Sequence, residues 1–257
     1  MSFLDTLKDV IKAVDTQRMK DHPFCSVIVP AAGTSSRMGG RDKLFEPLDE
    51  TPVLARTLLQ VNACALVDEI VIPARRDDIG RIAAMMTAYG IDKISRIIPG
   101  GASRGESVRI ALRECSREVE LIAVHDGARP LASTALIERC VRMGARTRAC
   151  VAALPVKDTI KQARDGIVAA TPERETLYAA QTPQVFDAAL LKAAYEKAQQ
   201  EGKSYTDDSA AVEALGKHVF LCEGEASNLK ITEPYDLAVA ARLLEELDGN
   251  VSDRAWL

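Results

Sequence analysis

A loop of small, hydroxyl-bearing and cationic residues follows the first strongly apolar segment of the chain, and its composition suits a phosphate ligand. The loop runs to Lys43 and begins Pro30-Ala31-Ala32-Gly33. Residues this small let backbone N–H groups turn toward an anion. Arg37 can bind phosphate oxygens through its forked guanidinium, and Lys43 adds a compact positive charge. The loop therefore predicts a triphosphate site, and an ordinary strand-to-helix loop with solvated cations is the alternative. It has neither Walker spacing nor the dinucleotide pattern Gly-x-Gly-x-x-Gly.

An acidic residue stands directly after another apolar run. Asp126 follows the segment 121–125, within His-Asp-Gly-Ala-Arg-Pro. A carboxylate at the carboxyl end of a strand, beside a phosphate loop, suits Mg²⁺, which is a hard ion that prefers oxygen ligands. Asp126 can equally be a turn or helix-capping acid, since such acids are common in loops.

The segment 100–107, Gly-Gly-Ala-Ser-Arg-Gly-Glu-Ser, follows a third apolar run and could frame a planar base. Its glycines permit the close approach of a ring, and its polar atoms could read the edge of the base. The alternative is a plain helix start, with Ser103 as the N-cap and Glu106 at capping-box spacing.

Three more polar segments have both a functional and a structural interpretation. Thr206 opens Thr-Asp-Asp-Ser, which also suits an N-cap followed by acids that favour a helix start. Thr182, in Thr-Pro-Gln, can belong to a simple turn. Lys230 lies between apolar neighbours and is either a site lysine or a solvated strand lysine.

From residue 25 onward, short apolar runs alternate with longer helical patterns, and this alternation predicts the scaffold. We expect strands at 25–30, 69–73, 96–99, 121–125, 150–156 and 219–222. We expect helices at 54–66, 79–89, 106–117, 133–146, 187–200, 207–215 and 234–247. Continuous apolar strands separated by helices indicate a Rossmann-like α/β fold, with a mostly parallel twisted sheet and helices on both faces.

The alternation breaks between Lys157 and Gln184, where the pattern predicts a hairpin. Two β-prone pieces, 159–162 and 166–171, flank Ala-Arg-Asp-Gly, and Asp-Gly between such pieces is a hairpin signal. We expect a two-stranded arm at 157–178 that projects from the sheet. Because an isolated hairpin is only marginally stable in water, a second copy of the chain is the natural partner for it.

Composition and charge narrow the class of protein. The chain has 257 residues, with Lys+Arg 33 against Asp+Glu 37 for a net charge of −4, and 4% aromatic residues, which argues against a nucleic-acid binder. No apolar run approaches the roughly 18 residues that span a bilayer. The six cysteines form no Cys-x-x-Cys pair and indicate reduced thiols in a cytoplasmic protein. We expect an amphipathic helical leader at 1–24, one domain at 25–247 and a flexible tail at 248–257.

Taken in order, the polar segments resemble those of cytidylyltransferases among the sugar-phosphate nucleotidyltransferases. Besides the loop 30–43, the matching segments are 125–130 (His-Asp-Gly-Ala-Arg-Pro), 155–161 (Pro-Val-Lys-Asp-Thr-Ile-Lys), 181–184 (Gln-Thr-Pro-Gln), 206–208 (Thr-Asp-Asp) and 228–232 (Asn-Leu-Lys-Ile-Thr). The set is similar to the 2-C-methyl-D-erythritol 4-phosphate cytidylyltransferase family of the non-mevalonate isoprenoid pathway. The resemblance covers residues 25 to about 245, so that 25–247 would be the cytidylyltransferase domain.

The resemblance implies a reaction and a set of roles. An oxygen of the substrate phosphate attacks the α-phosphorus of CTP, and pyrophosphate leaves. The catalytic residues implied are Arg37 and Lys43, and Asp126 would organise Mg²⁺. The nucleotide-binding positions implied are Pro30, Ala31, Ala32, Gly33, Gly101, Ala102, Arg104 and Ser107. The substrate-positioning residues implied are Asp126, Arg129, Thr159, Arg174, Thr182, Thr206 and Lys230.

In the family, the arm reaches across a homodimer, so the resemblance implies that Thr159 and Arg174 act in the partner's site. Three alternatives remain. Ribitol-5-phosphate cytidylyltransferases share the loop and the arm, whereas the arm argues against a molybdopterin-type nucleotidyltransferase. A nucleotide-binding regulator without turnover is disfavoured because the chain keeps all four charged site residues, Arg37, Lys43, Asp126 and Lys230.

Overall fold

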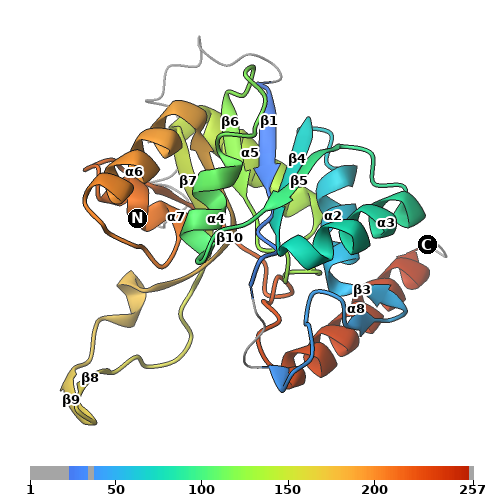
Figure 1. Cartoon of the computed structure of the whole chain (residues 1–257). Helices are drawn as coiled ribbons and strands as arrows, with labels where there is room; N and C mark the ends of the chain where they lie inside the picture. Colours follow the sequence, from blue (N-terminus) through green and yellow to red (C-terminus); the bar gives the residue numbers. More distant parts are fainter. Residues whose placement is uncertain (1–22, 34–37, 255–257) are drawn as a thin grey trace.

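The computed structural model describes residues 23–33 and 38–254, and a seven-stranded sheet forms the centre of this part of the chain (Figure 1). The strands lie in the order β11 (Phe220–Glu223), β7 (Ala149–Pro155), β10 (Tyr178–Asp187), β6 (Leu121–Val124), β1 (Cys25–Ile28), β4 (Glu69–Ala74) and β5 (Ile94–Pro99). β1 is parallel to both of its neighbours, β4 and β6. β4 is also parallel to β5, and β7 to β11. The predicted mostly parallel sheet is confirmed.

β10 is a strand that the sequence pattern did not predict, and it runs antiparallel between β6 and β7. Thr182 lies inside this strand, so its interpretation as part of a simple turn was wrong. The register with β7 shifts between Ala180 and Gln184. The half of β10 before this shift is largely exposed, whereas Val185 and Phe186 are buried. The strand therefore lacks the continuous apolar run by which the other strands are recognised.

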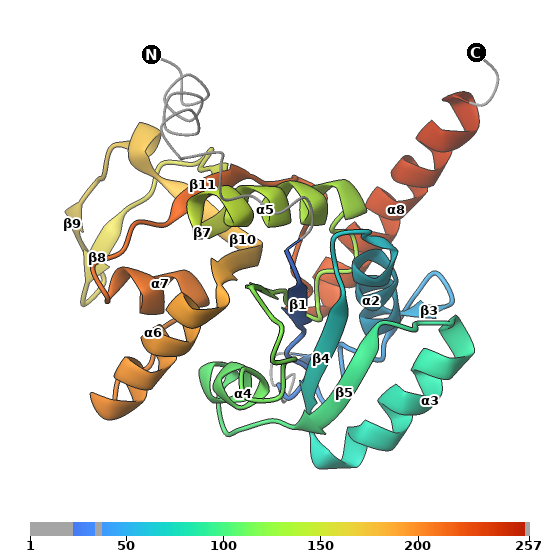
Figure 2. The same ribbon diagram turned by 90° about the horizontal axis from the view of Figure 1, so that it is seen from above.

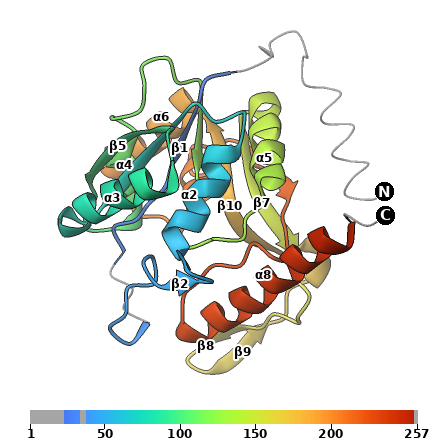
Figure 3. The same ribbon diagram turned by 90° about the vertical axis from the view of Figure 1, so that its right-hand side faces the viewer.

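Helices cover both faces of the sheet, as predicted (Figure 2). On one face, which Figure 3 shows toward the viewer, are α2 (Val53–Ala63), α3 (Ile79–Tyr89) and α5 (Thr134–Thr147). On the other are α4 (Arg104–Ala111), α6 (Ala188–Gln200) and α7 (Asp208–Glu213). Val27 packs with the first group and Ile28 with the second, because successive side chains of a strand point to opposite faces. The two apolar cores are thus built by alternation along the same strands.

Some boundaries differ from those predicted. α4 ends at Ala111, before the predicted end at Arg117, and α8 (Pro234–Arg254) continues past the predicted end at Leu247. Three short elements were not predicted: the hairpin of β2 (Pro47–Leu48) and β3 (Thr51–Pro52), and the 3₁₀ turns η3 (Arg76–Asp78) and η4 (Arg174–Thr176). Residues 1–22 of the predicted leader lie outside the described residues. Within residues 23–33 and 38–254, no helix combines the length and the apolar character needed to cross a membrane.

The predicted arm is a hairpin of β8 (Gln162–Arg164) and β9 (Ile167–Ala170) that projects from the body of the molecule (Figure 1). Asp165 and Gly166 form its turn with positive φ values of 51° and 78°, the pair that a tight hairpin turn requires. Residues 157–171 are all exposed. They include three large apolar side chains, Ile160 at 38%, Ile167 at 73% and Val168 at 56% exposure, which are typical of a surface that another chain covers.

Candidate active site

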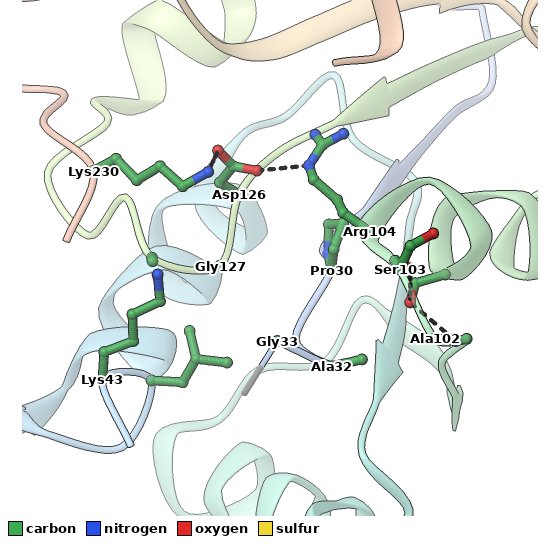
Figure 4. A pocket seen from close by; sticks show the side chains of 14 residues that line it. Pro30, Ala32, Gly33, Lys43, Ala102, Ser103, Arg104, Asp126, Gly127 and Lys230 are labelled. Carbon is green, nitrogen blue, oxygen red and sulfur yellow. Dashed lines mark hydrogen bonds and ion pairs between the residues drawn. The ribbon is translucent and has the colours of Figure 1, made fainter. Parts of the chain in front are cut away.

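A cavity of about 260 Å³ lies at the carboxyl ends of β1, β5 and β6, where ligands bind in open parallel sheets. The loops after these three strands line it (Figure 4), together with Leu44 and Lys230. Ten of the expected site residues are among its lining: Pro30, Ala32, Gly33, Lys43, Gly101, Ala102, Arg104, Ser107, Asp126 and Lys230. The structure therefore brings together all but one of the expected nucleotide-binding positions with three other charged residues.

The start of the predicted phosphate loop is held by a main-chain bond to the neighbouring strand. The N–H of Ala31 donates to the carbonyl of Pro73 at 2.8 Å, and Ala31 is buried. Ala31 extends the sheet beside the cavity, whereas Ala32 and Gly33 line the cavity itself. The expected catalytic Arg37 falls in residues 34–37, which lie outside the described residues, so its role stays a prediction.

Lys43 enters the cavity from the other side of the same loop. Its Nζ donates a hydrogen bond to the carbonyl of Ile231 at 2.9 Å. Ile231 is next to Lys230, so this bond ties the phosphate loop to the segment that carries the second cavity lysine. Two positive charges from distant parts of the chain are thereby placed on one wall.

The segment 100–107 forms the predicted helix start and also lines the cavity. Ser103 is the N-cap of α4, since its Oγ accepts from the N–H of Glu106 at 3.1 Å. The carboxylate of Glu106 in turn accepts from the N–H of Ala102 at 2.8 Å. Ser107 Oγ accepts from the N–H of Gly101 at 3.0 Å and donates to the carbonyl of Ser103 at 2.9 Å. The capping bonds of α4 therefore shape the cavity wall, and reading of a base there stays a prediction.

A buried carboxylate gathers three cations at the centre of the site. Oδ2 of Asp126 lies 2.8 Å from Nζ of Lys230, and Oδ1 lies 3.2 Å from Nε of Arg104 (Figure 4). Oδ2 also lies 3.5 Å from Nε of Arg129. Burial by itself raises the pKa of Asp126, but Arg104, Lys230 and Arg129 hold the pKa well below its usual range. Asp126 is therefore ionised, and the cluster carries more positive than negative charge.

Arg129 and Thr182, expected to face the substrate, lie beneath the cavity and hold Asp126 in place. Thr182 is 4% exposed, and its Oγ1 accepts from the N–H of Asp126 at 3.0 Å. Arg129 is 8% exposed and donates to the carbonyl of Asn228 at 2.6 Å. Asn228 donates to the carbonyl of Thr182 at 2.9 Å and closes the frame. Neither Arg129 nor Thr182 is among the residues that line the cavity.

Three other expected site residues do not line the cavity of their own chain. Thr206 is exposed, and Asp207 rather than Thr206 is the N-cap of α7. Thr159 and Arg174 are exposed on the arm segment, where Arg174 donates to the carbonyl of Lys157 at 3.3 Å. The roles of these three residues stay predictions.

Sequence reasoning did not identify Asp208 as a partner of the site. Its Oδ2 lies 2.7 Å from a terminal nitrogen of Arg104, and the residue is fully buried. The sequence feature that could have identified Asp208 is the pair of acidic residues after Thr206. That pair also suits a helix start, and nothing in the sequence tells which of the two acids faces a cation.

Comparison with known proteins shows the family of this chain. Residues 25–246 match the family model described as 2-C-methyl-D-erythritol 4-phosphate cytidylyltransferase. The chain belongs to this family. A relative of that name from Symbiobacterium thermophilum is 45% identical over 224 residues, which cover 86% of this chain and 93% of the relative. Another of that name, from Halalkalibacterium halodurans, is 40% identical over 222 residues, which cover 86% and 97% of the two chains.

Solved structures of the family have the same fold. The 4-diphosphocytidyl-2C-methyl-D-erythritol synthase of Anaerococcus prevotii superposes with a TM-score of 0.78 at 33% identity, over 86% of this chain and 96% of that one. The 2-C-methyl-D-erythritol 4-phosphate cytidylyltransferase of Thermus thermophilus gives a TM-score of 0.70 at 32% identity, over 86% and 98%. The predicted family membership and α/β fold are therefore confirmed.

Gly100 brings the two walls of the cavity into contact, and a side chain does not fit there. A Cβ at Gly100 would lie 2.5 Å from the Cβ of Ala32 and 2.9 Å from Oγ of Ser107. We expect Gly100→Ala to push the walls apart and to raise the Kd for CTP, the nucleotide expected from the sequence, about tenfold in calorimetric titration. Gly105→Ala is the matched control, because its Cβ meets only Cε1 of Tyr195 at 3.7 Å. Similar Kd values for both variants would refute this account of Gly100.

Burial of His125 predicts a pH dependence of stability. His125 is 1% exposed, and burial lowers its pKa to about 4. Its ordinary pKa is about 6.5, so between pH 6.5 and 4 the unfolded chain binds a proton that the native chain does not. The free energy of unfolding therefore falls as the pH falls through this range, by about 3 kcal/mol from this residue.

Urea unfolding of the wild type and of His125→Asn at pH 7 and pH 4 measures this contribution. We expect the variant to lose less stability between the two pH values than the wild type does. The same substitution at the exposed His218 should leave the wild-type difference unchanged. An identical pH dependence in the wild type and His125→Asn would contradict the prediction.

Proposed function

We propose that this protein transfers the cytidylyl group of CTP to the phosphate of 2-C-methyl-D-erythritol 4-phosphate and releases pyrophosphate. The names of its relatives and the family match over residues 25–246 support this reaction. The observation that carries the proposal is the convergence of a phosphate loop, Lys43, Asp126 and Lys230 on one cavity. These groups come from three separate segments, the phosphate loop that ends at Lys43 and the segments of Asp126 and Lys230. Together they suit a polyanionic nucleotide beside a second phosphate.

The chemistry explains why the site is built from cations and backbone. An oxygen of the substrate phosphate forms a bond to the α-phosphorus of CTP, while the bond from that phosphorus to the pyrophosphate oxygen breaks. Both reactants are anions, and charge grows on the leaving pyrophosphate, so positioning and charge neutralisation account for most of the catalysis. In this proposal Lys43 and Arg37 stabilise the growing charge. Lys230 binds the substrate phosphate, and the backbone at Ala32 and Gly33 surrounds the triphosphate.

The remaining residues divide between the base and the substrate. We assign the wall of Gly101, Ala102 and Ser107 to the cytosine, with Arg104 beside it, because these residues line the same cavity as Ala32 and Gly33 of the phosphate loop. Arg129 and Thr182 act on the substrate through Asp126, which both of them hold. Thr206, which is exposed just before α7, contacts the substrate in this proposal.

We assign Asp126 as the protein ligand of a Mg²⁺ ion. Asp126 is the carboxylate among the described lining residues, and the described part of the chain has no group of three or more His, Cys, Asp or Glu that could hold a metal by itself. This fits Mg²⁺, which commonly takes one or two carboxylates and obtains its other ligands from substrate phosphates and water. When bound, the ion would neutralise charge on the phosphates.

A pyrophosphate-release assay tests the proposal. We expect release with CTP, Mg²⁺ and 2-C-methyl-D-erythritol 4-phosphate, and much less with UTP, ATP or GTP or with ribitol 5-phosphate as the acceptor. Lys43→Ala should lower kcat by about 100-fold or more, whereas Lys217→Ala, at an exposed lysine outside the cavity, should not. No release above an enzyme-free blank refutes the proposal, and a preference for ribitol 5-phosphate would assign that substrate instead.

We further propose that two copies of the chain pair through the arm, so that Thr159 and Arg174 of each chain reach the substrate phosphate of the other. Ile160, Ile167 and Val168 support this pairing, because they are large apolar side chains left exposed on the arm. The six cysteines are buried free thiols, which suits a reducing compartment, and we propose a cytoplasmic location.

Mixed dimers test whether the arm acts across the interface. We expect Arg174→Ala and Lys43→Ala homodimers to be poorly active, because each lacks a needed cation in both sites. A dimer of one chain of each kind should regain one working site, since both defects then fall in the other site. Activity recovered after the two variants are unfolded and refolded together is the readout. No gain over the separately refolded variants would show that Arg174 serves its own chain.

A further inference from the structure

Arg104, the first residue of α4, is held between two carboxylates from different parts of the chain. Its Nε lies 3.2 Å from Oδ1 of Asp126, and its Nη2 lies 2.7 Å from Oδ2 of Asp208. Asp126 follows β6, whereas Asp208 is the first residue of α7. One guanidinium therefore joins three segments at the cavity wall, and Figure 4 shows Arg104 reaching from α4 toward Asp126.

Asp208 is itself fixed by its surroundings. It is fully buried, and its Oδ1 accepts the hydroxyl of Tyr195 at 2.5 Å. Its own N–H donates to Oε1 of Gln184 at 3.1 Å. Burial raises the pKa of Tyr195, so the hydroxyl keeps its proton and remains a donor. A carboxylate with both oxygens engaged cannot follow Arg104, so it sets the position and the plane of the guanidinium.

Charge balance alone does not account for this arrangement. Asp126 already has Lys230 at 2.8 Å and Arg129 at 3.5 Å. A buried ion pair contributes little net stability, because the cost of removing its charges from water offsets their attraction. A planar fork held at two of its nitrogens does, however, acquire a fixed direction. The second carboxylate is therefore better explained by geometry than by stability.

We propose that Asp208 is a positioning residue for nucleotide binding, which acts by fixing Arg104 against the base side of the cavity. Tyr195 supports it by holding the other oxygen of the same carboxylate. The inference rests on the proposed function, in which Arg104 belongs to the nucleotide half of the site.

A double-mutant cycle on CTP binding tests this role. Asp208→Asn keeps the size of the side chain but removes its charge, and we expect it to raise the Kd for CTP with Mg²⁺ about tenfold. It should also raise the KM for CTP, while the KM for the polyol phosphate stays nearly unchanged. In the background of Arg104→Met, Asp208→Asn should cause no further rise in Kd, because the residue through which Asp208 acts is gone.

The neighbouring acid provides a matched control. Asp207 is the N-cap of α7 and accepts from Nε2 of Gln184 at 2.9 Å. Asparagine caps helices about as well as aspartate, so Asp207→Asn should leave the Kd for CTP unchanged. Urea unfolding of every variant measures any general loss of stability alongside the binding data.

Each outcome decides the matter. An equal rise in Kd from Asp208→Asn in both backgrounds would mark a general structural effect and overturn the proposal. If Asp208→Asn does not fold, Tyr195→Phe takes its place, since it removes only the hydroxyl. The proposal would be overturned if Tyr195→Phe does not raise the Kd for CTP. It would also be overturned if Tyr195→Phe raises the Kd equally in the Arg104→Met background. A wild type that binds no CTP counts against the proposed function. Normal turnover of the wild type, together with additive effects of the two substitutions on the Kd for CTP, counts only against the positioning role of Asp208.

Discussion

The buried carboxylate of Asp126 is the interaction on which the rest of the site depends. Three cations from separate segments, Arg104, Arg129 and Lys230, meet at its two oxygens. Without this negative charge the three would repel one another in a partly dry environment, where electrostatic interactions are strong. Its position is in turn fixed through its own N–H, which Thr182 accepts. One residue therefore sets the relative positions of α4, the floor of the cavity and the segment around Lys230.

The sheet order explains why Asp126 can take this role. β6 lies beside β1, so the loop that carries Asp126 emerges next to the phosphate loop. On its other side β6 pairs with β10, and Gln184 lies opposite Val124 in the register. This pairing brings Thr182, just before Gln184 in β10, under the loop that follows Val124. Because β10 runs antiparallel to β6, the part of β10 before Gln184, rather than its last residues, lies at this end of the sheet beside the loop after β6.

Much of this arrangement follows from the sequence by local rules. Apolar runs and helix patterns predict the parallel strands, and the rule that ligands bind at carboxyl ends of strands places the loops after β1, β5 and β6 together. Long-range pairing is harder to predict. β10 was missed because its exposed and buried halves hide its pattern. Thr182 and Arg129 were expected to face the substrate because a motif gives proximity but no side-chain direction. Asp208 was missed because only the fold shows that the start of α7 meets Arg104.

The cationic side chains of the cluster differ in burial, and this difference separates fixed supports from side chains that can reach a ligand. A chain with a net charge of −4 places Arg104, Arg129 and Lys230 around two carboxylates, Asp126 and Asp208. These carboxylates weaken the attraction for an anion, but they hold the donors in place before a ligand arrives, so binding requires little reorganisation. Arg129 is 8% exposed and tied to Asn228, so it serves as a fixed support. The side chain of Lys230 is 38% exposed. In the proposed function it would exchange Asp126 for a phosphate oxygen while this support stays in place.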